Sequence, residues 1–208
     1  MIRHSSIERF LDELASRSST PGGGSVAAMV GAMGAALLSM VCHLTIGKAK
    51  YRDVEEELAA VLARTEQLRK QLMEMADEDV ASFSAVMRAY AMPRQTPEES
   101  ALRTQAIQDA LKEATRVPLR CCRVCREIID LSAVVAQKGN SNVLSDAGVA
   151  AVAAHAALRS GALNVMINVK AVTDRQFVAD QLTELDGLLS QASAATEACY
   201  RFVSKAIS

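Results

Sequence analysis

A short loop, Ser19-Thr20-Pro21-Gly22-Gly23-Gly24-Ser25, leads directly into an uncharged segment, Val26–Ile46. Consecutive glycines are unfavourable in a helix or strand because each loses more backbone freedom on folding than other residues do. Such a loop lets the backbone approach a ligand closely, and Ser25 is placed to cap the following helix. A helix N-terminus after such a loop also attracts anions. Taken alone, the loop favours a simple turn, because it matches no phosphate-binding motif.

The segment that follows the loop decides the fold class. Val26–Ile46 has 21 residues and no Asp, Glu, Lys or Arg, which is long enough to cross a bilayer. It is rich in Ala and Gly rather than Leu and Ile, so its insertion into lipid would be marginal. Ala28, Gly31 and Ala35 recur at helical spacing and allow another helix to pack closely. With no second segment of this kind, we expect a buried central helix and no membrane partner.

The amino-acid composition favours a helical protein and gives no reason to expect nucleic-acid binding. Half of the residues are apolar but only 3% are aromatic, so the core must consist of Ala, Leu, Val and Met, which suits packed helices. A net charge of -1 gives no electrostatic reason to expect nucleic acid. An odd number of cysteines, and an amphipathic N-terminus unlike a signal peptide, indicate reduced thiols and a cytoplasmic protein.

Helical periodicity runs along the whole chain. We predict an all-α fold: one domain over residues 1–208, a multi-helix bundle of long antiparallel helices around a buried Ala/Gly-rich central pair. Pro118 is expected to kink or divide its helix. The apolar stripe of the third helix, including Phe83 and Met87, is predicted to face the core. The expected helices span about 5–16, 26–45, 53–90, 97–137 (opened by Thr96 or Pro97), 147–170 (capped by Ser145-Asp146) and 175–208 (capped by Thr173 or Asp174).

Two of these helices are apolar nearly all the way round, which exceeds what one thin bundle can cover. They are the Ala/Gly-rich helices that follow the loops at Pro21–Gly24 and Gly139–Asn142. We therefore expect self-association, with a homodimer as the simplest form.

Five motifs occur in an order that identifies a family. Together they closely resemble the cyclodeaminase/cyclohydrolase family of folate enzymes over about residues 7–203. Within that family, residues 117–127 are most similar to the stand-alone methenyltetrahydrofolate cyclohydrolase branch of methylotrophic bacteria. The other branch, formiminotetrahydrofolate cyclodeaminase, is frequently fused to a formiminotransferase domain that this sequence lacks. The motifs are Pro21–Ser25, Leu44–Tyr51, Asp79–Phe83, Ala89–Pro93 and Gly139–Val149.

The resemblance implies an all-helical dimer that binds a folate with its one-carbon unit between N5 and N10. It implies hydrolysis of 5,10-methenyltetrahydrofolate to 10-formyltetrahydrofolate. The alternatives are an ammonia-releasing cyclodeaminase acting on 5-formiminotetrahydrofolate, and a non-catalytic folate-binding helical protein. We expect no metal and no organic cofactor, because the methenyl carbon of the substrate is already electrophilic.

Site residues follow from the matched motifs. Lys48 is the first choice for a direct catalytic role, and Asp79 and Asp146 are carboxylate candidates for proton transfer or pterin recognition. Without the resemblance, Lys48 would only neutralise a helix C-terminus, Asp79 would lie on a solvated face and Asp146 would be an N-cap. The candidate substrate-binding residues are Pro21, Gly22, Gly23, Gly24, Ser25, Tyr51, Asn140, Asn142 and Ser145.

Other features receive structural interpretations. Cys121, Cys122 and Cys125 occupy a helical pattern without a fourth ligand, so we expect small buried side chains rather than a metal site. His43 and His155 lie in apolar helices, where packing is expected. Arg116, Arg120 and Arg123 share one helix face, and we expect a solvated basic face balanced by Glu113 and Glu127 rather than a site for the glutamate tail of a folate.

Overall fold

A computed structural model describes all residues, Met1–Ser208, and every regular element in it is a helix. The predicted all-α fold is therefore confirmed. Three short 3-10 helices join or precede the longer elements: η1 (Ile2–His4), η2 (Ala49–Val54) and η3 (Ser141–Val143). The α-helices are α1 (Ile7–Leu14), α2 (Gly23–His43), α3 (Glu55–Tyr90), α4 (Pro97–Lys138), α5 (Leu144–Val169) and α6 (Arg175–Ile207).

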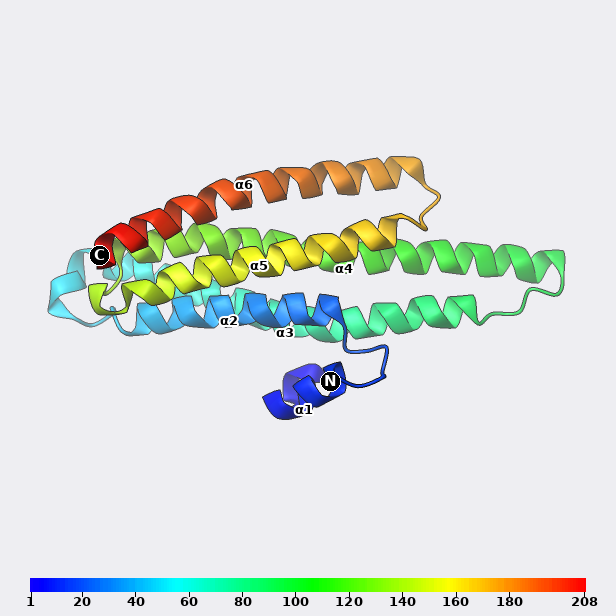
Figure 1. Cartoon of the computed structure of the whole chain (residues 1–208), viewed down its shortest axis with the longest axis horizontal. Coiled ribbons are helices and arrows are strands. Elements are labelled where there is room, and N and C mark those ends of the chain that lie inside the picture. Colours follow the sequence, from blue (N-terminus) through cyan, green and yellow to red (C-terminus); the bar gives the residue numbers. More distant parts are fainter.

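The five long helices, α2 to α6, run alternately up and down side by side, and short α1 lies beside them (Figure 1). Ser25 near the start of α2 contacts Ala76 of α3, while Ser39 near the end of α2 contacts Thr65. The two helices are thus antiparallel. The hairpin of α3 and α4 continues well beyond the first residue of α2 (Figure 1).

Helices α2 and α5 pack into the middle of the bundle through small residues. A Cβ atom on Gly31 of α2 would lie 2.9 Å from Cys125 Sγ, and one on Gly161 of α5 would lie 2.9 Å from Cys122 Sγ. Two buried sulfur atoms of α4 therefore fill the spaces that these glycines leave. The predicted Ala/Gly-rich central pair and the predicted buried cysteines are confirmed.

Two helices, not one, are long and apolar enough to cross a membrane by length and composition. They are Gly23–His43 and Ser141–Val169, whose most apolar windows are 61% and 44% buried inside the bundle. The prediction that Val26–Ile46 is the only such segment is wrong. Asp146, His155 and Arg159 interrupt the apolar pattern of the second helix, which makes its length as a possible span harder to recognise.

Pro118 was predicted to kink or divide its helix; it lies within α4 and does not divide it. Proline has no N–H to offer the carbonyl group four residues earlier. That carbonyl, of Ala114, instead accepts a hydrogen bond of 2.7 Å from the side-chain amide of Asn168 in α5. A neighbouring helix thus satisfies the group that the proline leaves free.

Two predicted helix starts are confirmed and two are wrong. Thr96 caps α4 ahead of Pro97, and Asp174 caps α6 by accepting the N–H of Phe177. Ser25 does not cap α2, which already begins at Gly23 with Gly22 as its N-cap. Ser145 and Asp146 lie inside the first turn of α5, because η3 leads the chain directly into Leu144.

The inner stripe of α3 is buried only as far as α2 accompanies it. Leu58, Leu68 and Leu72 are buried, whereas Phe83 and Met87 are 38% and 52% exposed. The prediction that these last two residues face the core is wrong, because they lie beyond the N-terminal end of α2.

Candidate functional site

Helix α2 begins against a carboxyl group of α3. Ser25 Oγ donates a hydrogen bond of 2.9 Å to Asp79 Oδ2 and lies 3.2 Å from the carbonyl oxygen of Ala76. A Cβ atom on Gly24 would lie 2.1 Å from Asp79 Oδ1, so any other residue at this position would require Asp79 or α2 to move. We call the group formed by Pro21–Ser25, Asp79 and the neighbouring Asn164 the Asp79 end.

Asp79 occupies the place of a helix cap. The N-cap residue, Gly22, has no side chain to offer the free N–H groups of the first turn of α2. A carboxylate near a helix N-terminus is stabilised by those groups and by the helix dipole. Burial nevertheless raises the pKa of Asp79, and the hydroxyl and backbone N–H of Ser25 offset only part of that rise. The carboxyl group of Asp79 therefore holds a proton more readily than an exposed aspartate.

Asn164 of α5 belongs to the Asp79 end, although the sequence did not single it out. Its side-chain nitrogen and oxygen would lie 3.5 and 3.7 Å from a Cβ atom on Gly23. The signal available in the sequence was a carboxamide in the apolar stretch 161–167 of an Ala-rich helix.

A second group of predicted residues lies where α2 ends and α5 begins. Gly47 has a φ of 79°, which favours glycine, and the exposed Lys48 follows it as the N-cap of η2. The hydroxyl of Tyr51 accepts a hydrogen bond of 3.1 Å from the backbone N–H of Ser141. We call this group the Lys48 end; its members are Lys48, Tyr51, Asn140, Ser141, Asn142, Ser145 and Asp146.

Asn140 holds the Lys48 end together and is itself buried. Its side-chain nitrogen donates to the carbonyl oxygen of Leu44 at 2.8 Å, and its backbone N–H donates to Thr45 Oγ1 at 2.9 Å. Its side-chain oxygen accepts the N–H of Asn142 at 3.1 Å. These contacts engage both ends of the carboxamide, so Asn140 positions the loop. Asn142 and Ser145 are exposed, and Asp146 is half-buried in the first turn of α5.

The two ends of the candidate site are far apart in one chain. Asp79 lies beside the first turn of α2, and Lys48 follows its last turn, so a helix of 21 residues separates them. At 1.5 Å per residue this separation is about 30 Å. The structure brings Lys48 and Asp146 to the same end of the bundle, and it does not bring Asp79 or the glycine loop to them.

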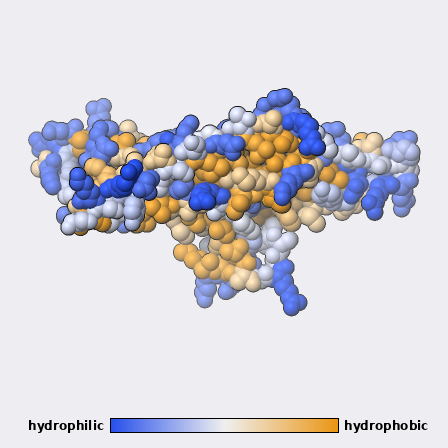
Figure 2. Space-filling model, turned by 45° about the horizontal axis from the view of Figure 1, so that its top comes forward, coloured by the Kyte–Doolittle hydropathy of each residue, from blue (hydrophilic) through white to orange (hydrophobic).

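Exposed apolar side chains lie on the helices between the two ends. Large hydrophobic side chains of α2 and α5 are open to solvent, including Met33, Met40, Val152 and Leu163. Figure 2 shows hydrophobic residues gathered over the middle of the bundle and over the small N-terminal helix below it. A cavity of about 440 Å³, lined by Ser145–Ala156 of α5 and Tyr200–Ile207 of α6, lies on the α5 and α6 side.

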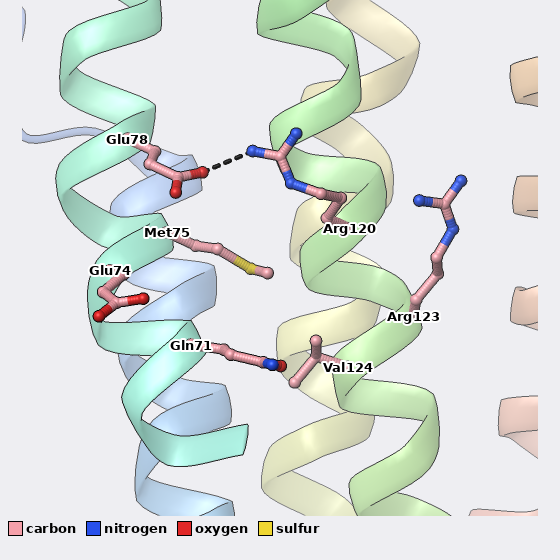
Figure 3. A pocket seen from close by; sticks show the side chains of 7 residues that line it. All are labelled: Gln71, Glu74, Met75, Glu78, Arg120, Arg123 and Val124. Carbon is pink, nitrogen blue, oxygen red and sulfur yellow. Dashed lines mark hydrogen bonds and ion pairs between the residues drawn. The ribbon is translucent and has the colours of Figure 1, made fainter. Parts of the chain in front are cut away.

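The basic face of α4 forms a polar pocket with α3, with a volume of about 380 Å³. Arg120 reaches across it to Glu78 at 2.5 Å, whereas Arg123 points away from it (Figure 3). Arg123 pairs with Glu184 of α6, and Arg116 pairs with Glu113. The prediction of a balanced basic face is confirmed, except that Glu127 pairs with Arg64 of α3 instead.

Metal-binding and thiol chemistry find no support in these side chains. No group of three or more His, Cys, Asp or Glu side chains is placed to hold a metal ion. All five cysteines are buried and free, and burial raises the pKa of Cys42 to about 11. The predicted packing of His43 is wrong, because it is exposed; His155 is half-buried, with its Nε2 atom 3.4 Å from Ser193 Oγ.

Comparison with known proteins agrees with this architecture. The profile of the family described as Formiminotransferase-cyclodeaminase matches residues 6–187. The chain is 57% identical to the Methenyltetrahydrofolate cyclohydrolase of Methylorubrum extorquens, over 98% of both chains. It is 36% identical over 187 residues to the rat Formimidoyltransferase-cyclodeaminase, of which it covers 35%.

A solved structure shares the fold. The formiminotetrahydrofolate cyclodeaminase of Thermotoga maritima superposes with a TM-score of 0.84 at 35% identity, covering 99% of this chain and 97% of that one. A superposition that covers nearly all of both chains, and a family profile that matches most of this one, lead to one conclusion: the chain belongs to the formiminotransferase-cyclodeaminase family.

Proposed function

We propose that this protein hydrolyses 5,10-methenyltetrahydrofolate to 10-formyltetrahydrofolate in one-carbon metabolism. The observation that carries the proposal is the 57% identity, over 98% of both chains, to a relative named for that activity. Water attacks the electrophilic carbon between N5 and N10, and the bond from that carbon to N5 then breaks.

The residues at the two ends of the site suit a cationic substrate. Lys48 supplies positive charge beside the hydroxyl group of the adduct, which favours the loss of the hydroxyl proton as the formyl carbonyl forms. Asp146 is placed to receive the amidine-like edge of the pterin ring. Asp79 supplies a second carboxyl group, whose pKa burial raises. Pro21–Ser25, Asn142, Ser145 and Tyr51 complete the binding surface, and Asn140 positions it.

A homodimer would unite the two ends. A two-fold axis perpendicular to α2 reverses the direction of that helix in the second copy. The exposed apolar surface of α2 and α5 would then be covered, and Asp79 of the partner subunit would approach Lys48. Each dimer would contain two such composite sites, and each site would need residues from both chains.

The remaining features of the proposal concern cofactors and location. The reaction requires no metal or organic cofactor, because the substrate carries the electrophilic carbon. The absence of a three-ligand metal cluster is compatible with this mechanism. The buried free cysteines fit a reducing compartment, so we place the protein in the cytoplasm.

One assay separates the three candidate functions. With purified protein, the loss of methenyl absorbance measures hydrolysis, and ammonia release from 5-formiminotetrahydrofolate measures cyclodeaminase activity. The names of the rat and Thermotoga relatives support the cyclodeaminase as the second candidate. We expect methenyl loss with little ammonia. Ammonia release alone would establish the cyclodeaminase, and folate binding without either reaction would establish a binding protein.

Mixing two inactive variants tests the composite site. Lys48→Met and Asp79→Asn each damage every site of their own homodimer. In a mixed dimer, one site carries both substitutions and the other carries neither. Unfolding and refolding an equal mixture should therefore restore about a quarter of the wild-type activity. A mixture as inactive as its components would place the complete site within one chain.

A further inference from the structure

The hydroxyl of Tyr51 joins the two loops of the Lys48 end. Tyr51 lies in η2, three residues after Lys48, and its hydroxyl accepts the backbone N–H of Ser141 at 3.1 Å. Ser141 opens η3, which leads directly into the first turn of α5 and thus to Asp146. A single oxygen atom therefore lies between the loop that carries the candidate cation and the loop that leads to the candidate carboxylate.

The groups around this oxygen atom accommodate both of its protonation states. The Ser141 N–H donates to it, and Ser141 Oγ at 3.4 Å can do the same, which favours a phenolate. Asn140 Oδ1, also at 3.4 Å, can only accept, which favours a phenol. A group with partners for both forms is suited to exchanging a proton.

We propose that Tyr51 is the proton-transfer group of the Lys48 end, which takes a proton from the attacking water and returns it to the leaving nitrogen. This inference rests on the proposed hydrolysis of 5,10-methenyltetrahydrofolate. It assigns to Tyr51 a step for which the matched motifs suggested the carboxyl groups of Asp79 and Asp146 as candidates.

Charge and hydrogen bonding support this role. The ammonium group of Lys50 lies 5.1 Å from the centre of the Tyr51 ring, and the facing loop contributes only the neutral Asn140 and Ser141. The Ser141 hydrogen bonds, and to a smaller extent Lys50, lower the pKa of Tyr51 from 10.0 to about 8. A general base is most effective when its pKa lies close to the working pH.

The proposed step balances atoms and charge. The water oxygen forms a bond to the methenyl carbon as the Tyr51 phenolate accepts one water proton, which gives a neutral carbinolamine and a phenol. The bond from that carbon to N5 then breaks, and N5 takes the proton back from Tyr51. The remaining hydroxyl proton leaves to solvent as the formyl carbonyl forms. One proton is released overall, and Tyr51 returns to the phenolate form in which it began.

Absorbance titration tests the phenol directly, without substrate. The chain has three tyrosines and no tryptophan, so tyrosinate absorbance near 295 nm reports on few groups. We expect one tyrosine to titrate near pH 8 in the wild type. Tyr51→Phe should abolish that step, and Tyr90→Phe, the matched control at the far tip of α3, should retain it. A wild type in which all tyrosines titrate near pH 10 would overturn the proposal.

Kinetics then test the role of the phenol in turnover. After subtraction of the uncatalysed rate at each pH, wild-type kcat should rise with pH and level off above about pH 8. Tyr51→Phe should lower kcat by about 10²-fold or more with little change in KM, and its rate should no longer follow that curve. Retention of kcat within about threefold of the wild type would overturn the assignment.

A second variant separates proton transfer from loop anchoring. Ser141→Ala keeps the backbone N–H but removes a hydroxyl that lowers the pKa of Tyr51. The absorbance step and the midpoint of the kcat profile should move together to higher pH. If the absorbance step moves and the kinetic midpoint does not, Tyr51 only anchors the loop. A wild type without hydrolase activity would overturn the proposed function, whereas an active Tyr51→Phe enzyme would overturn only this inference.

Discussion

The Ser25 hydroxyl donates to Asp79 Oδ2 at 2.9 Å, although 54 residues separate the two positions in the chain. This bond fixes the start of α2 against α3. It also shows why a residue with the sequence features of an N-cap does not act as one. The hydroxyl is committed to α3, and Asp79 takes the position beside the helix N-terminus that a capping side chain would occupy.

We predict that Asp79→Asn stabilises the protein at neutral pH. Burial raises the pKa of Asp79 above its ordinary value of 3.8. A group of this kind stabilises the fold fully below its unfolded pKa, and that contribution is lost as pH rises through the folded pKa. Asparagine resembles the protonated carboxyl and does not ionise. Its thermal midpoint at pH 7 should exceed that of the wild type by about 2–4 °C.

The advantage of Asp79→Asn should shrink as pH falls through the raised pKa of Asp79 and vanish below 3.8, where the aspartate is protonated in the folded and the unfolded chain alike. Thermal unfolding at several pH values measures this trend. Asp186→Asn, at an exposed aspartate of α6, is the matched control and should show no such trend. A destabilised Asp79→Asn at pH 7 would mean that the ionised carboxylate stabilises the fold as a helix cap.

Two of the loop glycines, Gly22 and Gly24, should differ sharply on substitution by alanine. Gly24→Ala places a Cβ atom 2.1 Å from Asp79 Oδ1, so α2 or Asp79 must move. We expect a loss of about 1–3 kcal/mol in the free energy of unfolding, measured by denaturant titration. Gly22→Ala, whose nearest atom would lie at 3.9 Å, is the control and should fold normally. Equal stability of both variants would contradict the packing described for Asp79.

Two substitutions on α2 should separate folding from assembly. Gly31→Leu overpacks the contact with Cys125 Sγ inside one chain, so it should cost about 1–3 kcal/mol or more of stability. Met33→Glu changes an exposed side chain on the opposite side of the same helix, so it should keep the fold and weaken the dimer. Light scattering at micromolar concentration measures the second effect. A folded wild-type monomer under those conditions would rule out the proposed homodimer.

Chelators should leave activity intact. No three His, Cys, Asp or Glu side chains are placed to hold a metal ion, and the proposed reaction uses a substrate that is already electrophilic. Methenyl hydrolysis should therefore proceed at the same rate before and after dialysis against EDTA. A rate that falls on dialysis and recovers with zinc or magnesium would show that the reaction requires a metal ion.

The substitution Lys48→Met tests whether Lys48 only complements the charge at a helix end or takes part in the reaction. If Lys48 only complements a helix terminus, Lys48→Met should cost at most about 1 kcal/mol of stability and leave turnover nearly normal. If Lys48 lies against the reacting carbon, the fold should persist while kcat falls by about 10²-fold or more. Circular dichroism and steady-state kinetics measure the two effects, and we expect the second outcome.

Lys48→Arg provides the sharper comparison. It keeps the positive charge, but the planar guanidinium group places its donors differently and cannot act as a neutral base. We expect this variant to bind folate and to fail in turnover. Near-normal turnover would reduce Lys48 to a source of charge and leave the proton steps to Tyr51 or to the carboxyl groups.

The local pattern of the sequence was enough to predict the order and the approximate extent of the long helices. Thr96-Pro97 and Asp174 marked helix starts correctly, because a capping side chain contacts only residues two or three positions away. The Ala/Gly-rich central pair of helices could also be predicted, since small residues at helical spacing indicate that helices pack closely. The family motifs likewise pointed to the folate-enzyme family, to which the chain belongs.

Tertiary contacts decided what local pattern could not. Whether Phe83 is buried depends on where α2 begins, and the continuity of α4 through Pro118 depends on an amide supplied by Asn168. The separation of Asp79 from Lys48 depends on the direction of α2 within the bundle, which no short motif encodes. The sequence alone determined which residues form helices and which family they represent. Only the packing of those helices decided which functional groups lie together. Packing brings together residues that are far apart in the chain, and local sequence does not specify such contacts.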